Sequence, residues 1–312
     1  MITSHWILGP GAIGRLLAHS LAPLNNTCVI SRRPLPVQQT LTTPEGKQTA
    51  QRLAILTVAE LAKQASSPPD FVHITTKAMA AETALASLAA ILPSATPLVL
   101  WQNGFLAQPQ ITQAWAGPVL CATTTQGAYL TGDDSVVHAG RGPTFIGDLK
   151  NRHCALSGDL ARQLTQAGFE TTAVDNIHQR LWQKLAVNAA INPLVALHGI
   201  RNGELRNTPY KDQVDAVIQE VVAIMQAEGI QPPGSEQGET DWPKLVWQVV
   251  ENTANNKASM RQDLEAKRPT ERKAILGPLI QSAAQHGLCY ARLEQLDHEL
   301  ARQENFIERR SH

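Results

Sequence analysis

Apolar and polar positions along the first half of the chain alternate between strand-like runs and segments of helical period. The strand-like runs cover residues 5–9, 27–31, 70–76 and 96–104; helical spacing covers residues 12–24 and 80–92; residues 51–64 combine a short strand with a helix. This alternation predicts an α/β domain built on a parallel, doubly wound sheet. We expect the β-like segments 117–130 and 135–148 to extend that sheet in mixed orientation.

The second half of the chain has helical period throughout. The helical segments are residues 176–199, 210–230, 243–266, 271–288 and 291–303. We therefore predict two domains, an α/β domain over residues 1–175 and an all-α domain over residues 176–312. Residues 231–243 are expected to form a loop, and residues 305–312 are expected to fray.

Composition narrows the class of protein. Hydrophobic residues make up 43% and charged residues 17% of the 312 positions, which favours a large folded core. Lys plus Arg equals Asp plus Glu at 27 each, so we expect neither a nucleic-acid partner nor binding to a membrane surface. No run approaches the length of a membrane span, and the N-terminus does not resemble a signal peptide.

The four cysteines are scattered along the chain, at Cys28, Cys121, Cys154 and Cys289. They form no CxxC pair, and none lies beside a histidine at the spacing of metal ligands. We expect reduced thiols, a cytoplasmic protein and no metal site.

A glycine motif lies between the first strand and the first helix. Gly9, Gly11 and Gly14 have G-x-G-x-x-G spacing, with Ala12 and Ile13 between the last two. The first glycine permits a tight turn, the second lets a pyrophosphate approach the backbone, and the third lets helix and strand pack closely. The motif predicts a Rossmann-type dinucleotide site; the alternative is a glycine-rich turn without a ligand.

The end of the second strand indicates the cofactor. NAD sites usually carry an acidic residue there, whereas this chain has Ser31, Arg32 and Arg33. Guanidinium groups bind a 2′-phosphate that a carboxylate would repel. The sequence therefore favours NADP(H), with solvated surface charge as the alternative.

Two further strands end in polar residues. Thr75, Thr76 and Lys77 follow one strand, and Gln102 and Asn103 follow the next. Ligands of open α/β sheets bind outside these carboxyl ends. Lys77 is a candidate for a cofactor phosphate and Asn103 for the nicotinamide ribose or the substrate; ordinary loop polarity is the alternative.

The predicted helix 176–199 carries Lys184, Asn188 and Asn192 at four-residue intervals in apolar surroundings. This spacing puts them on one face, which either lines a cleft or is the solvated side of the helix. A lysine of lowered pKa could protonate the alkoxide formed when a hydride reduces a ketone. Pro193 disfavours helical geometry at Asn192, so we expect a kink there.

Six segments together resemble the ketopantoate reductases (2-dehydropantoate 2-reductases). They are GPGAIG, TTKA, QNG, WQKLAVNAAINPLVAL, NGEL and NKASMRQDLEAKRPTE, spread between residues 9 and 271. The resemblance implies NADPH-dependent reduction of 2-dehydropantoate to (R)-pantoate, on the route to pantothenate and coenzyme A.

The resemblance also implies a role for individual residues. Lys184 matches the general acid, and Glu271 matches a glutamate that holds a substrate or ribose hydroxyl. Asn103, Asn188, Asn192 and Ser259 match substrate-binding positions, and Arg32 and Lys77 match cofactor-phosphate positions. From the residues alone, Ser259 is predicted to lie in the middle of a helix, where simple exposure to solvent explains a serine equally well. Glu271 is equally well explained as a carboxylate in the first turn of a helix that Thr270 caps.

Two segments depart from the family pattern, residues 105–107 after QNG and residues 123–130. They leave open which 2-oxo acid is reduced. The alternatives are a reductase of another branched 2-oxo acid and a non-catalytic NADPH sensor. The apolar helical half favours a homodimer without requiring one.

Overall fold

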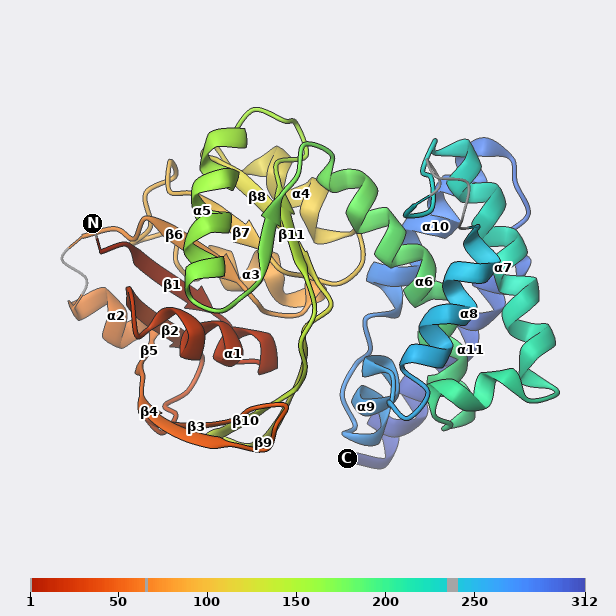
Figure 1. Cartoon of the computed structure of the whole chain (residues 1–312), viewed down its shortest axis with the longest axis horizontal. Helices are drawn as coiled ribbons and strands as arrows, with labels where there is room; N and C mark the ends of the chain where they lie inside the picture. Colours follow the sequence, from red (N-terminus) through yellow and green to blue (C-terminus); the bar gives the residue numbers. More distant parts are fainter. Residues whose placement is uncertain (1, 65–66, 235–240, 312) are drawn as a thin grey trace. The chain divides into compact units, whose positions relative to one another are not determined.

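The computed structural model describes residues 2–64, 67–234 and 241–311 (Figure 1). The chain forms two compact units. The first contains the residues up to Gln102 together with Ala107–His178, and the second contains Asn103–Leu106 and the residues from Gln179 onward. Within the described residues, no helix is both long and apolar enough to span a membrane.

An eight-stranded sheet forms the framework of the first unit. Its strands, in spatial order, are β12 (Thr171–Ala173), β11 (Thr144–Gly147), β8 (Val119–Thr124), β7 (Leu98–Leu100), β6 (Phe71–Ile74), β1 (Ser4–Leu8), β2 (Asn26–Ser31) and β5 (Ala54–Thr57). All neighbouring pairs are parallel except β8 with β11. The predicted α/β fold with a parallel, doubly wound sheet is confirmed.

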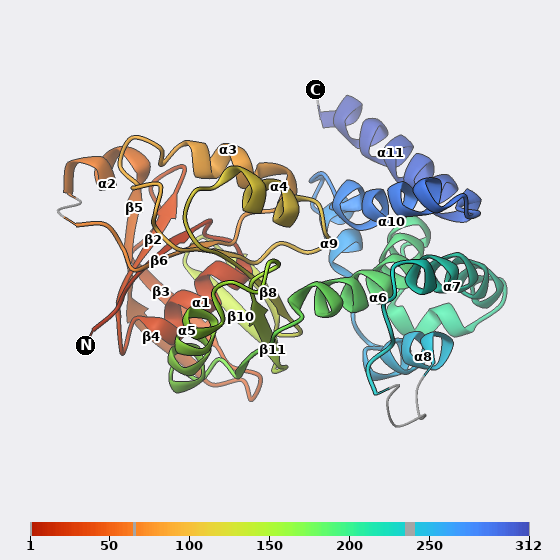
Figure 2. The same ribbon diagram turned by 90° about the horizontal axis from the view of Figure 1, so that it is seen from above.

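Helices cover both faces of this sheet (Figure 2). One face carries α1 (Ala12–Leu21) and α5 (Cys154–Gln166); the other carries α2 (Val58–Gln64), α3 (Ala81–Ala86) and α4 (Ala107–Ala114). Every residue of β6, β7 and β8 is buried, as expected for strands covered on both sides. The expected helix 80–92 is shorter than predicted, because Ser87 Oγ bonds back to Ala84 O and residues 87–92 form turns.

The expectation for residues 117–148 was only partly right. β8 and β11 extend the main sheet, but β9 (Gly127–Gly132) and β10 (Ser135–Gly140) form a hairpin in a second sheet, in the order β4-β3-β10-β9. Its other strands are β3 (Gln38–Thr42) and β4 (Gln48–Arg52). The hairpin lies against α1, where Val136 is fully buried, so it gains both a pairing partner in β3 and apolar contact.

The second unit is helical, as the period predicts. Its helices are α6 (Ile177–His198), α7 (Tyr210–Ala227), α8 (Trp242–Asn252), α9 (Ser259–Glu265), α10 (Arg272–His286) and α11 (Ala291–Ser311), with a 3₁₀ turn at Asn202–Arg206. The segment 243–266 is two helices, because the asparagine-rich residues 253–258 favour turns over helix. The last residues were expected to fray, yet α11 continues to Ser311.

The structure differs from two further expectations about this unit. Much of the predicted loop 231–243 lies outside the described residues, but its end starts α8: Asp241 is the N-cap, and its carboxylate accepts a hydrogen bond from Lys244 N at 2.7 Å. Helix α6 passes through Pro193 without a break, so Asn192 is helical. Leu194 and Val195 are buried in the core beside Pro193, and this packing offsets the cost of proline in a helix.

Candidate active site

The glycine-rich turn after β1 is packed tightly at two of its three glycines. Gly9 has φ +118°, and a Cβ there would lie 2.8 Å from Thr76 N. A Cβ on Gly14 would lie 2.1 Å from Gly9 O, so any larger residue would separate the helix from the strand. These two positions therefore require glycine for reasons internal to the protein.

Gly11 differs, because the space around it is open. A Cβ there would meet only Thr75 O, at 3.8 Å, so the fold itself tolerates a larger residue. Gly11 is the N-cap of α1, and the first-turn N–H groups, those of Ala12 and Ile13 included, have no partner within the helix. An open loop at a helix N-terminus fits a pyrophosphate.

Side chains at the strand ends hold this loop in place. Thr75 Oγ1 donates to Gly9 O at 2.7 Å, and Gln102 Nε2 donates to Ile74 O at 2.7 Å and to Thr76 O at 3.0 Å. Sequence reasoning noticed Gln102 but gave it no role. Its position two residues after a buried strand was the available signal.

The two arginines after β2 have different surroundings. Arg33 forms an ion pair with Asp133 at 2.6 Å. Arg32 is exposed, and within the described part of the chain its side chain makes no hydrogen bond or ion pair. Arg32 is therefore the arginine that can bind a phosphate without first giving up a carboxylate.

Lys77 is exposed just beyond the end of β6. Its backbone is extended, and it precedes a short 3₁₀ turn at Ala78–Ala80. Lys77 and the glycine turn therefore lie at the same edge of the sheet, because β1 and β6 are parallel neighbours and each segment follows the carboxyl end of its strand.

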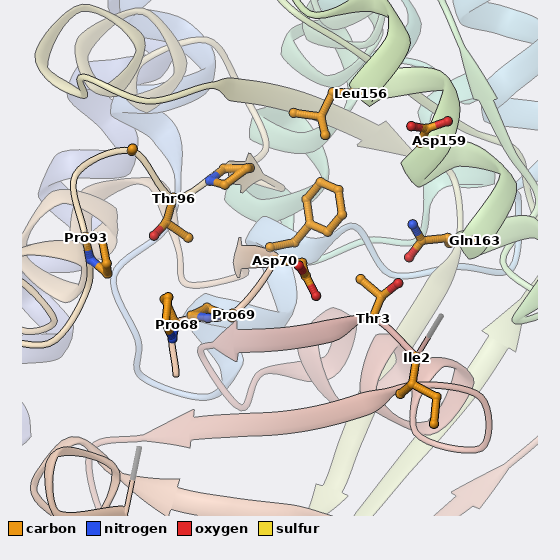
Figure 3. Close-up of a pocket in the computed structure, with 13 residues that line it drawn as sticks. Ile2, Thr3, Pro68, Pro69, Asp70, Pro93, Thr96, Leu156, Asp159 and Gln163 are labelled. Atoms are coloured by element: carbon orange, nitrogen blue, oxygen red, sulfur yellow. The ribbon is translucent and has the colours of Figure 1, made fainter. Parts of the chain in front are cut away.

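A pocket of about 640 Å³ lies at the opposite edge of this sheet (Figure 3). Its lining includes Thr3, Asp70 and Thr96, which precede β1, β6 and β7, so it opens at the amino ends of those strands. None of the predicted site residues is among those that line it. The cofactor candidates follow the carboxyl ends instead, where open α/β sheets bind nucleotides.

Three predicted residues meet in the helical unit. Lys184 Nζ, on α6, donates to Asn103 Oδ1 at 2.9 Å, and Asn103 Nδ2 donates to Glu271 Oε2 at 3.2 Å. One amide thus links a cation to a carboxylate through its two ends. These residues come from three separate parts of the chain, and no local pattern predicts that they meet.

Burial lowers the pKa of Lys184 to about 8, while the negative charge of Glu271 opposes that shift. A lysine with this pKa is protonated near neutral pH yet gives up its proton far more readily than an exposed lysine. Lys184 therefore has the properties of a general acid for alkoxide protonation.

Asn188 and Asn192 follow Lys184 along α6, Asn188 partly buried and Asn192 only 8% exposed. Neither side chain makes a hydrogen bond among the described residues. Buried amides usually have partners, so these two are available to a polar ligand.

Ser259 and Glu271 occupy positions that differ from the sequence reading. Ser259 is the first residue of α9, not a mid-helix residue, and it is exposed. Glu271 is itself the N-cap of α10 and makes no capping bond, while its carboxylate bonds to Asn103. Thr270 Oγ1 donates to Glu304 at 2.5 Å and accepts only a long bond, 3.3 Å, from Arg272 N.

The segment Asn103–Leu106 is held against α10. Phe105 N donates to Ala274 O at 3.0 Å, and a Cβ on Gly104, which has φ +81°, would lie 2.1 Å from the same oxygen. The Phe105 ring packs 5.6 Å from that of Trp182. Phe105 thus packs against the helical core and helps to hold Asn103 beside Lys184.

Sequence reasoning missed the contacts that hold Glu271. Glu304 on α11 accepts from Thr270 N at 2.8 Å and from Arg272 Nε at 2.9 Å, and Asp297 accepts from Arg272 Nη1 at 2.5 Å. Both neighbours of Glu271 are therefore tied to α11. No sequence signal links residues so far apart in the chain.

The chain matches known proteins over both units. The family model described as Ketopantoate reductase PanE/ApbA matches residues 6–151, and that described as Ketopantoate reductase PanE/ApbA C terminal matches residues 176–304. The 2-dehydropantoate 2-reductase of Vibrio cholerae is 36% identical over 283 residues, which cover 90% of this chain and 91% of that protein.

Solved structures share the fold. A D-mandelate dehydrogenase in ternary complex with NADH and anilino(oxo)acetate has a TM-score of 0.85 at 21% identity, covering 97% of this chain and 99% of that one. A dimeric ketopantoate reductase from Staphylococcus aureus has a TM-score of 0.78 at 21% identity, with the same coverage. The two family models and the Vibrio cholerae relative show that the chain belongs to the ketopantoate reductase family of nicotinamide-dependent oxidoreductases.

Proposed function

We propose that this protein reduces 2-dehydropantoate to (R)-pantoate with NADPH, a step toward pantothenate and coenzyme A. The observation that carries the proposal is the Lys184–Asn103–Glu271 arrangement, in which burial sets the pKa of Lys184 at about 8. The match to curated 2-dehydropantoate 2-reductases supports the choice of substrate. In this proposal residues 1–175 bind the cofactor and residues 176–312 bind the substrate.

The cofactor site consists of the residues at the carboxyl ends of β1, β2 and β6. The open backbone at Gly11 and the first turn of α1 accept the pyrophosphate, with Gly9 and Gly14 keeping the loop closed. Arg32 binds the 2′-phosphate and Lys77 a further cofactor phosphate, which makes NADPH the preferred form. The cofactor, once bound, supplies the hydride that reduces the ketone carbon.

The helical unit supplies the proton and holds the substrate. Lys184 Nζ gives its proton to the oxygen that becomes the hydroxyl of pantoate, and the positive charge stabilises negative charge developing there. Asn103 orients Lys184 and also contacts the nicotinamide ribose or the substrate, while Glu271 accepts a hydrogen bond from a hydroxyl group. Asn188, Asn192 and Ser259 supply amide and hydroxyl groups for the rest of the substrate.

The direct test follows the loss of NADPH absorbance with purified protein and 2-dehydropantoate, beside NADH and a panel of other branched 2-oxo acids. Rapid oxidation of NADPH with 2-dehydropantoate alone is the expected result. Tight NADPH binding without turnover of any oxo acid would instead support the regulatory NADPH sensor.

A reductase of a different 2-oxo acid is the second candidate. The fold is shared with a D-mandelate dehydrogenase whose ternary structure contains NADH and anilino(oxo)acetate, so the fold alone does not select the substrate's side chain. Turnover that is faster with another branched oxo acid than with 2-dehydropantoate would favour this candidate.

The quaternary structure and the location belong to the same proposal. The dimeric state of the Staphylococcus aureus protein supports a homodimer, which sedimentation can test. All four cysteines are free thiols in the structure, which fits a protein that works in the reducing cytoplasm.

A further inference from the structure

Arg15 is a buried cation that the proposed mechanism does not use. It lies on α1, directly after the last motif glycine, and is only 3% exposed. Buried arginines normally pair with carboxylates, but the hydrogen bonds of this side chain go to neutral oxygens. They join Nε to Pro10 O at 2.9 Å, and Nη1 to Gln39 Oε1 at 3.2 Å, Gly132 O at 3.1 Å and Asp133 O at 2.7 Å.

The bond to Pro10 acts on the glycine loop. The carbonyl of Pro10 and the N–H of Gly11 belong to one planar peptide group and point in opposite directions. When Arg15 fixes the carbonyl, it also fixes the direction of the Gly11 N–H. Of the three motif glycines, Gly11 is the one with open space around it, so this N–H is a donor that a phosphate can reach.

The other bonds of Arg15 end on the turn of the β9–β10 hairpin. Gln39 Nε2 braces the same turn by donating to Asp133 O at 3.0 Å and to Pro36 O at 2.6 Å. The carboxylate of Asp133 holds Arg33, the neighbour of Arg32, at 2.6 Å. The hairpin turn is therefore connected to the glycine loop through the Arg15 side chain and to the arginine pair through the Asp133 carboxylate.

From these contacts we infer that Arg15 is a positioning residue for the cofactor's pyrophosphate, which links the hairpin turn to the Gly11 N–H through Pro10. The inference rests on the proposed cofactor site but not on the identity of the oxo acid. Because NADPH and NADH share the pyrophosphate, Arg15 affects both cofactors alike, whereas Arg32 affects NADPH alone.

The test measures the Kd of NADPH and of NADH by fluorescence titration of the full chain. Arg15→Lys keeps the positive charge but cannot reach both Pro10 and the hairpin, so it isolates geometry from charge. We expect both Kd values to rise about tenfold, the effect of one misplaced hydrogen bond to a charged group, with their ratio unchanged. Arg15→Gln, which removes the bond to Pro10 together with the charge, replaces the lysine variant if that variant does not fold.

Gln39→Leu is the matched control, because it removes the bonds of Gln39 to the hairpin turn and to Arg15 Nη1 but leaves the bond from Arg15 Nε to Pro10 O in place. We expect a lower Tm with both Kd values within about twofold of the wild type. A lower Tm with unchanged Kd values in the Arg15 variants would overturn the inference and leave Arg15 a purely structural residue. An equal rise in Kd for Gln39→Leu would also overturn it, since the hairpin as a whole would then be responsible.

The outcomes separate this inference from the proposed function. A wild-type protein that binds neither cofactor would overturn both. Normal wild-type binding with unaffected Arg15 variants would overturn the inference alone. Weakened binding in those variants, in a protein that does not reduce 2-dehydropantoate, would support the inference and overturn the proposed function.

Discussion

At the scale of single residues, the proposed chemistry depends on Lys184. Removing its ammonium group in Lys184→Ala should lower kcat by about a hundredfold or more, the range of lost general acid catalysis. In the wild type, kcat for reduction should be constant below pH 8 and fall as pH rises above it, because the pKa of Lys184 is about 8 and only the protonated form gives up a proton.

Steady-state kinetics between pH 6 and 10 check both parts of this prediction. Cofactor binding to Lys184→Ala is the control, since the residue lies outside the unit that is proposed to bind the cofactor. Near-normal turnover in the variant, or a wild-type profile flat through pH 9, would show that another group donates the proton.

We also expect a single residue to decide the cofactor preference. Arg32→Ala should weaken NADPH binding about tenfold to a hundredfold and leave NADH binding nearly unchanged, because only NADPH carries the 2′-phosphate. Arg33→Ala is the matched control, since that arginine is already paired with Asp133. Titration of each variant with both cofactors makes the comparison, and an equal loss of both cofactors in Arg32→Ala would exclude Arg32 as the 2′-phosphate ligand.

At the scale of secondary-structure elements, α11 holds the start of α10 and with it Glu271. Burial raises the pKa of Glu304, but the bonds from Thr270 and Arg272 outweigh burial and keep it below the ordinary value. Glu304→Gln weakens these bonds and should lower the free energy of unfolding by about 2 kcal/mol, the scale of a damaged, largely buried charged network. It should also lower kcat more than it raises KM for the substrate.

Denaturant unfolding and steady-state kinetics test this prediction. Glu299→Gln, on the same helix, is the control, because its carboxylate bonds to Gln295 rather than to α10. If Glu304→Gln loses stability but keeps its kcat, then α11 supports the fold without orienting Glu271.

The same elements show what the sequence can predict and what it cannot. Gly9, Gly11 and Gly14 form a local motif whose spacing indicates a strand, a tight turn and a helix, so the structure around the proposed cofactor loop can be predicted from the sequence. The Lys184–Asn188–Asn192 face likewise follows from helical period. The hydrogen bonds between Thr270 and Glu304 and between Arg33 and Asp133 are different. They join residues that no periodic sequence pattern relates, and only the folded chain brings these residues together.

Local pattern also fails where tertiary packing outweighs it. The proline in α6 and the hairpin that leaves the main sheet both contradict the local signal, and both are stabilised by buried contacts elsewhere. Ser259 shows a different limit. The short asparagine-rich turn before it interrupts the predicted helix, so Ser259 is the first residue of α9 and not a mid-helix residue. The roles of Ser259 and Glu271 came from family resemblance and not from periodicity.

At the scale of the whole molecule, a buried histidine pair links folding to pH. Trp101 Nε1 donates to His73 Nδ1 at 3.1 Å, so neutral His73 carries its proton on Nε2 and donates to His5 Nδ1 at 3.0 Å. Burial lowers the pKa of His5 to about 4 and the pKa of His73 well below its ordinary value. Neither imidazole gains a proton in the folded state under mildly acidic conditions.

The pair therefore makes the folded protein sensitive to acid. In the unfolded chain both histidines take up protons near pH 6.5, while His5 in the folded chain does so only near pH 4. The free energy of unfolding should fall as pH drops from 6.5 toward 4, by about 3 kcal/mol from His5 alone and further from His73. Urea unfolding at pH 7, 6, 5 and 4.5 measures this slope.

Two variants test whether His5 is responsible. His5→Asn keeps an acceptor for His73 but does not titrate, so it should be less stable at pH 7 and show a shallower dependence of unfolding free energy on pH. The exposed His298 is the control, and His298→Asn should keep the wild-type slope. A wild-type slope retained in His5→Asn would mean that other groups, such as carboxylates, control unfolding in acid.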